Sequence, residues 1–184
     1  LLTVTDGTKG TLLLKTPLEW AFCRDPNDTG VASGWAYKPV DMSWWKARKD
    51  AGSVDSHREN PGHWEMLRTD LYMQAQGVVT PDYHSYTGHA WYRTDIDVPA
   101  DAAKGNVHIR FPGLFNECWL YVNGHLVKHR PLPGLWWLND YKFEWDVDLT
   151  GLLKPGVNTL AIRLNNPHHF GGMFRRPFLY RPNP

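Results

Sequence analysis

The loops of this sequence carry aromatic and polar side chains of the kinds that recognise a sugar ring. One face of such a ring consists of C–H groups and lies well against the electron-rich face of Trp or Tyr, while its hydroxyls need hydrogen-bonding partners. The loop residues that could stack on a ring or bond its hydroxyls are Tyr83, His84, Tyr86, Trp136, Trp137, Asn139, Asp140, Asn165, Asn166, His168, His169, Phe170 and Arg175. These residue types predict ligand binding at the loops.

The acidic residues of the same loops argue against hydrolysis by this chain. A glycosidase needs two carboxyl groups that flank the scissile bond and differ in pKa. The acids of these loops are Asp82, Glu117 and Asp140, and Asp140 borders a strand, where solvent exposure or a loop cap explains it equally well. We therefore expect no catalytic residue in this chain.

Metal binding has only weak candidates. His168 and His169 are adjacent, and adjacent side chains of an extended chain point to opposite faces, which is a poor arrangement for a shared ion. In the oxygen-rich segment 24–30, Asp25, Asn27 and Asp28 could hold a structural calcium ion. The same residues commonly form turns, so the alternative to calcium is a metal-free turn, and the sequence requires no cofactor.

The elements that must position these loops are predicted from alternation. Residues 141–147 and 157–166 alternate apolar and polar side chains, which is the period of half-buried strands. Gly151, Pro155 and Gly156 break the pattern between them. We predict that these two strands pair antiparallel, so that the loop 165–172 leaves the pair at the end opposite the turn.

Other runs extend the same pattern over most of the chain. Strands are predicted at residues 10–17, 18–23, 90–98, 107–111 and 175–182, and at 116–129 as a hairpin around Asn123-Gly124. Between Arg24 and Gly88 the periodicity is weak, and we expect short strands near Trp35 and Trp64–Leu67 and one helical turn after Ser43. The pattern predicts an all-β fold, an antiparallel β-sandwich of the jelly-roll kind, as a single domain over residues 1–184.

Antiparallel order sorts the loops between the two ends of such a sandwich. One end receives turn sequences, and the other receives residues 81–88, 112–117, 130–140 and 165–172, which carry the aromatic and His residues. Binding residues commonly lie on loops held by a rigid scaffold, so this loop-rich end is the predicted site. The alternative is that Trp136, Trp137 and Phe170 fold back as a lid on the core.

Composition excludes several classes of partner. The 20 basic and 19 acidic residues are interspersed and give a net charge of +1, so we expect neither nucleic acid nor a membrane as partner. Cys23 and Cys118 could form a disulfide or remain buried thiols. The sequence begins without Met, and we expect a module of a longer protein.

The order of several segments resembles a known family. The segments EWAFCRDP, GWAYKPVDMSWW, YTGHAWYRTDIDVP, ECWLYVNG, FEWDVDLTGLLKPGVNTLAIRLNNP and GGMFRRPFLY together resemble the galactose-binding-like jelly-roll domain at the N-terminus of family 2 glycoside hydrolases such as β-galactosidases. The resemblance covers residues 18–182. The segments RPLPGLWWLND and NNPHHFGG depart from the family pattern, and both fall on the loop-rich end.

The resemblance implies a function and a setting. It implies a secreted or periplasmic, non-catalytic carbohydrate-binding module that recognises an oligo- or polysaccharide and is covalently linked to a catalytic domain, with calcium in some relatives. The alternative is the N-terminal domain of a family 2-like hydrolase that completes the active site of a catalytic barrel. A third reading is a protein-interaction or adhesion sandwich. We expect one of Trp136 and Trp137 to be the main sugar platform and the other to support it.

Overall fold

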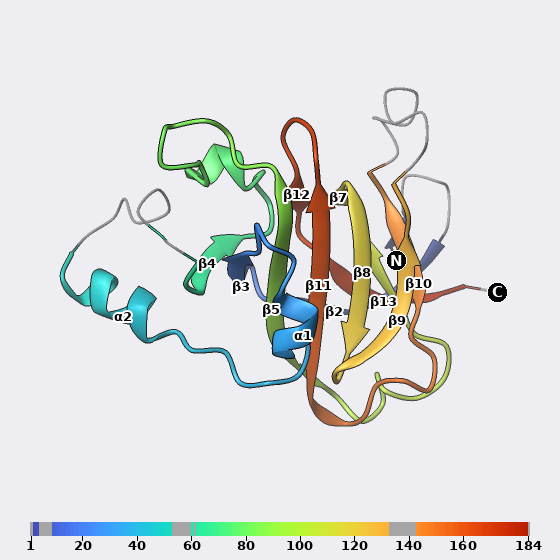
Figure 1. Cartoon of the computed structure of the whole chain (residues 1–184). Helices are drawn as coiled ribbons and strands as arrows, with labels where there is room; N and C mark the ends of the chain where they lie inside the picture. The colour runs from blue at the N-terminus through green and yellow to red at the C-terminus, as the bar shows by residue number, and fades with distance from the viewer. Residues whose placement is uncertain (1, 4–8, 53–59, 61, 133–142, 184) are drawn as a thin grey trace.

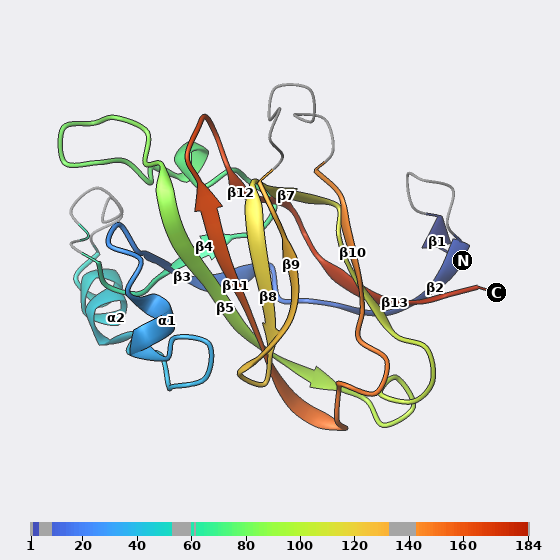
Figure 2. The same cartoon turned by 45° about the vertical axis from the view of Figure 1, so that its right-hand side comes forward.

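The computed structural model describes residues 2–3, 9–52, 60, 62–132 and 143–183. Two antiparallel sheets lie face to face and enclose the core (Figures 1 and 2), which confirms the predicted all-β sandwich. The front sheet has the order β4-β3-β5-β11-β8-β9. Its strands are β3 (Glu19–Arg24), β4 (Glu65–Arg68), β5 (Gly88–Val98), β8 (Glu117–Val122), β9 (His125–Arg130) and β11 (Gly156–Asn166).

The back sheet has the order β1-β2-β13-β6-β10. Its strands are β1 (Leu2–Thr3), β2 (Lys9–Lys15), β6 (His108–Phe111), β10 (Trp145–Asp148) and β13 (Phe178–Pro182), and β7 (Gly113–Phe115) pairs with β12 (Gly172–Arg175) in a third, two-stranded sheet. The helical segments are α1 (Gly30–Ser33), α2 (Ser43–Asp50) and the 3-10 turn η1 (Gln74–Gln76). Within the described residues, no helix is long and apolar enough to cross a membrane.

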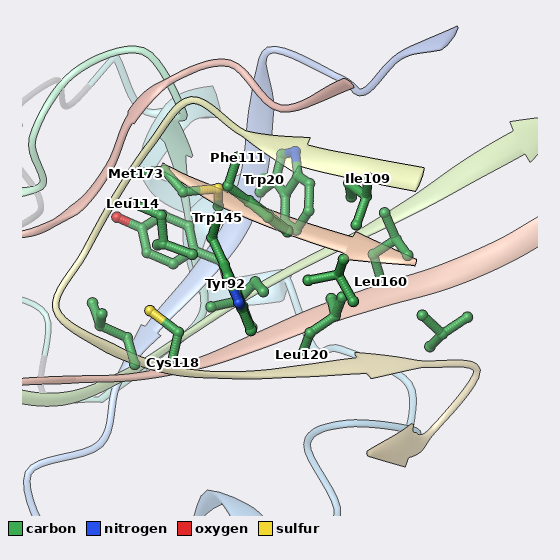
Figure 3. Close-up of a cluster of buried hydrophobic side chains, with 14 of the residues drawn as sticks. Trp20, Tyr92, Ile109, Phe111, Leu114, Cys118, Leu120, Trp145, Leu160 and Met173 are labelled. Atoms are coloured by element: carbon green, nitrogen blue, oxygen red, sulfur yellow. The ribbon is translucent and has the colours of Figure 1, made fainter. Parts of the chain in front are cut away.

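The core is built from the apolar faces of both sheets. Phe111 and Trp145 of the back sheet and Leu120 and Leu160 of the front sheet belong to one buried cluster (Figure 3). Alternate residues of β8 and β11 enter this cluster, as the sequence pattern predicts. Each large apolar side chain buried in this way contributes about 1.5–3 kcal/mol, and the rigid scaffold of the loops rests on these contacts.

The predicted hairpin of residues 141–147 and 157–166 is wrong. Strand β10 begins only at Trp145 and pairs with β6 in the back sheet, while β11 pairs with β5 and β8 in the front sheet. The connection between β10 and β11 therefore crosses from one sheet to the other, and its Leu149 and Leu153 are buried in the core. The two strands direct their apolar residues to the same core from opposite sides, which gives both the same alternation.

The region 24–88 also differs from the prediction. Trp35 lies in a turn and not in a strand. This turn follows α1, whose C-cap residue Gly34 adopts the left-handed conformation (φ 76°). After Ser43 the chain forms the eight-residue helix α2 and not a single turn. The loop predicted at 112–117 contains β7. The strand near Trp64 is confirmed as β4.

Candidate functional site

The loop-rich end is held together by one buried glutamine. The side-chain amide of Gln74 donates hydrogen bonds to the carbonyls of Tyr86 (2.7 Å) and His169 (3.3 Å). Its Oε1 accepts a bond from the Gly171 amide (2.9 Å). Gln74 thus ties the loop before β5 to the loop after β11. The strand register places both loops at one end, because Asn166 of β11 lies opposite Gly88 of β5.

A group of aromatic rings, of which Phe170 is exposed and Tyr72 and Phe174 are partly buried, follows this junction. The Tyr72 ring stacks on that of Phe174 at 4.3 Å between centroids, and it lies 6.0 Å from Phe170. Phe170 remains 55% exposed, so it is not a lid on the core. The Arg175 guanidinium carbon lies 5.8 Å from the Phe174 ring centroid. We call Tyr72, Phe170 and Phe174 the aromatic ridge.

The other predicted loop residues do not all reach this ridge. Tyr83 is 65% exposed, and His84 beside it lies 3.5 Å from the carboxylate of Asp82. These residues belong to the loop closed by the bridge between Val79 and Ser85. Tyr86 is buried and donates its hydroxyl hydrogen to the His89 carbonyl, so it is not an exposed platform.

The two adjacent histidines lie close to the ridge in sequence. The ring centroids of His168 and His169 are 6.4 Å apart, and the planes are tilted by 53°. His169 adopts a positive φ of 55°. Its carbonyl accepts hydrogen bonds from the side-chain amides of Gln74 and of Asn166 (3.0 Å for Asn166). The backbone of His169 therefore helps to fix the loop that carries Phe170.

Trp136, Trp137, Asn139 and Asp140 lie outside the described residues. The prediction that one of the two tryptophans is the main sugar platform therefore stays a prediction. It includes the assignment of Asn139 and Asp140 as polar partners of the sugar.

A cleft of about 450 Å³ opens at the same end of the sandwich, where β3 ends and β5 begins. Its walls come from segments that are far apart in the sequence. They are the residues after β3, the turn after α1, the segment before β4 and the loop before β5. The lining residues are Arg24, Asp25, Pro26, Asn27, Thr29, Trp35, Asn60, Gly62, Thr80, Pro81 and Tyr86. Alternation could not predict this cleft, because most of its wall comes from the aperiodic region 24–88.

The two carboxylates proposed for calcium have other partners. Asp25 accepts hydrogen bonds from the Thr29 and Gly30 amides (2.7 and 2.8 Å) and from Trp91 Nε1 (3.0 Å). Asp28 forms an ion pair with Arg163 at 2.6 Å. No three His, Cys, Asp or Glu side chains of the described residues cluster in a way that could hold a metal ion. A calcium ion held by Asp25, Asn27 and Asp28 stays a prediction.

Arg24 is a charged residue that sequence reasoning did not select. It is 6% exposed, and its Nη2 lies 4.0 Å from Glu65 Oε1. Burial, which removes water from the guanidinium, lowers the pKa of Arg24, and the negative charge of Glu65 opposes this shift. Its Nη1 donates to the Val79 carbonyl, so Arg24 joins β3 to the loop before β5.

The cysteines are free and buried. Cys118 belongs to the main core and Cys23 to a second cluster with Trp64 and Trp91, so the disulfide alternative does not apply. Burial raises the pKa of Cys23 to about 12 and that of Cys118 to about 11, which disfavours the reactive thiolate. We expect neither thiol of the folded chain to react with Ellman's reagent at pH 8 and both to react in denaturant. Rapid labelling of the folded chain would contradict this burial.

Comparisons with known proteins support a shared fold. No family model matches the chain. A putative β-glucuronidase of Formosa agariphila is 23% identical over 132 residues, which are 67% of this chain and 12% of that protein. The β-glucuronidase from Ruminococcus gnavus in complex with D-glucaro-d-lactam matches 99% of this chain with a TM-score of 0.67 and 16% identity, and this match covers 31% of that chain.

A second solved complex gives the same result. The R. gnavus enzyme in complex with C6-substituted uronic isofagomine matches 99% of this chain with a TM-score of 0.68 and 16% identity, over 30% of its own length. The chain thus spans about a third or less of each of these proteins. It has the fold of a segment of β-glucuronidases.

Proposed function

We propose that this chain is a non-catalytic accessory domain of a glycoside hydrolase and that its loop-rich end binds carbohydrate. The fold of a segment that makes up 31% of a solved β-glucuronidase supports the first part, because the rest of such a protein lies outside this segment. The exposed Phe170 supports the second part. It lies beside Tyr72 on a loop that Gln74 anchors.

The ridge supplies the two kinds of contact that a sugar needs. Phe170 offers an exposed ring face for the C–H groups of a sugar. His168, His169 and Arg175 flank this ring in the sequence and can donate hydrogen bonds to hydroxyls. Because Gln74 fixes the loop from the inside, little conformational freedom is lost when a ligand binds.

Replacement of Phe170 by Ala tests this role. We expect the affinity of the chain for a retained polysaccharide to fall about twentyfold, since loss of a binding hot spot costs about 2 kcal/mol. Affinity gel electrophoresis against a panel of soluble polysaccharides measures the change. Phe170 is 55% exposed, so the melting temperature is expected to change little.

Tyr37→Ala is the matched control. Tyr37 is also an exposed aromatic residue, at 61%, but it contacts Gly124 in the turn between β8 and β9, away from the ridge. We expect this variant to keep the wild-type affinity. Equal retention of Phe170→Ala and wild-type protein by every polysaccharide that binds would show that the ridge is not the binding surface.

The second candidate function is completion of an active site in a longer chain. The same fold match favours it, since the matched proteins are named as β-glucuronidases and are about three times longer than the matched segment. In this case the isolated chain shows little affinity. Phe170→Ala in the parent enzyme would then lower kcat/KM, while the 184-residue chain is not retained by any polysaccharide.

A further inference from the structure

The cleft beside β3 has the size and construction of a small-molecule site. Its volume of about 450 Å³ falls in the range of about 300–1,000 Å³ that is typical of ligand pockets. Phe170, Tyr72 and Phe174 do not line it. The cleft is therefore separate from the aromatic ridge, although loops of the same end of the sandwich form both.

Arg24 lines the cleft with unused hydrogen-bonding capacity. Among the described residues, its Nε and Nη2 have no hydrogen-bond acceptor, although the side chain is 93% buried. Buried donors of this kind are nearly always satisfied by protein, water or ligand. Both atoms are shielded from solvent, so a ligand hydroxyl in the cleft would supply the missing acceptor through one buried water molecule.

The charge around Arg24 favours a neutral ligand. Glu65 lies 4.0 Å from the guanidinium, and Asp25 also lines the cleft. Among these three described residues, Arg24 carries one formal positive charge and Asp25 and Glu65 carry two formal negative charges. An anionic ligand in the cleft would have to approach the carboxylate of Asp25, whereas a hydroxyl group would not meet this repulsion.

The walls suit the ring of a sugar. Trp35, half-buried, forms part of the wall, and its ring is fixed by edge contacts with Trp64 at 5.4 Å and Trp91 at 6.2 Å. A fixed aromatic side chain can receive the C–H groups of a sugar without loss of rotamer freedom. Asn27 and Thr80 add polar groups at the wall.

We propose that this cleft binds one or two neutral sugar units, as a site separate from the aromatic ridge. This inference rests on the proposed carbohydrate-binding function. It adds a second position along the glycan and a preference for uncharged sugars at that position.

The test uses neutral disaccharides and a charged sugar as probes. The 184-residue chain, labelled with ¹⁵N, is titrated with cellobiose, lactose, maltose and glucuronic acid, and the indole N–H signals of the tryptophans are followed. We expect at least one disaccharide to shift the Trp35 signal, and we expect glucuronic acid to bind more weakly. Tighter binding of glucuronic acid than of all three disaccharides would overturn the proposal.

Two variants locate the binding. Asn27→Ala changes an exposed wall residue, and Arg24→Gln with Glu65→Gln removes both charges of the buried ion pair. We expect the double variant to lose about tenfold in disaccharide affinity and Asn27→Ala about fivefold. Tyr37→Ala should keep the wild-type value, and thermal unfolding confirms that each variant is folded.

The outcomes separate this inference from the proposed function. Disaccharide binding that Phe170→Ala abolishes and that both cleft variants keep would overturn the cleft and leave the carbohydrate-binding function in place. If no probe at 20 mM shifts a tryptophan signal while a polysaccharide still retains the chain, sugar binding in the cleft is overturned and the proposed function stands. Absence of both disaccharide binding and polysaccharide retention would overturn the cleft together with binding by the isolated chain.

Discussion

Replacement of Asp25 by Ala is expected to lower the free energy of unfolding by about 3–4 kcal/mol. Asp25 is 1% exposed, and its carboxylate accepts bonds from the amides of Thr29 and Gly30 and from the indole of Trp91. The variant leaves these donors without their acceptor, and each buried unsatisfied group costs about 1–3 kcal/mol. Urea unfolding at pH 7, followed by tryptophan fluorescence, measures the change.

Asp28→Ala in the same loop is the matched control. Its carboxylate is 41% exposed and pairs with Arg163, which is 13% exposed, and we expect a smaller loss than for Asp25, because the Asp28 carboxylate is in contact with water. Equal losses in the two variants would contradict the role assigned to Asp25. The same unfolding curves with and without a chelator also test for calcium, because a stability loss on chelation would show a bound ion at work in the native state.

Replacement of Gly172 by Ala is expected to destabilise the chain by about 3 kcal/mol or more. Gly172 has a φ of 83°, and a Cβ built on it would lie 2.3 Å from the hydroxyl oxygen of Tyr92. Tyr92 is fully buried in the core, so it cannot move away cheaply. Backbone strain and overpacking each cost about 1–3 kcal/mol, and thermal unfolding measures their sum.

Gly151→Ala separates the two contributions. Gly151 has a similar φ of 75°, but no atom lies within 4 Å of its built Cβ. This variant carries the backbone strain alone, and we expect a loss of about 1 kcal/mol. If both variants lose the same amount, close packing of Tyr92 against Gly172 does not contribute.

The sequence predicts the strands of this fold better than their partners. Alternation in β5, β8 and β11 reports which residues face the core, and the structure confirms these faces. Alternation does not report which sheet a strand belongs to, because both sheets direct apolar residues to the same interior. The pairing of β10 with β6 instead of β11 follows from the sheet-to-sheet crossing of residues 149–155, for which the local pattern gives no signal.

The site is predicted less completely than the fold. Phe170 and the loop of His168 and His169 lie at the loop-rich end as predicted, because chain direction alternates at each antiparallel connection. Gln74 and Arg24 lie in an aperiodic region, where a polar residue gives no sign that it will be buried. The burial of Tyr86 could not be predicted either, since an aromatic side chain of a loop can pack inward as readily as outward.

The position of β13 has a consequence for how the protein is made. This last strand lies between β2, near the start of the chain, and β6. During synthesis, β2 therefore leaves the ribosome long before β13 exists. No strand connects β2 to β6 until residues 178–182 emerge. The back sheet can close only after residues 178–182 have been synthesised, and until then the edges of β2 and β6 that β13 later covers are available to chaperones or to other chains.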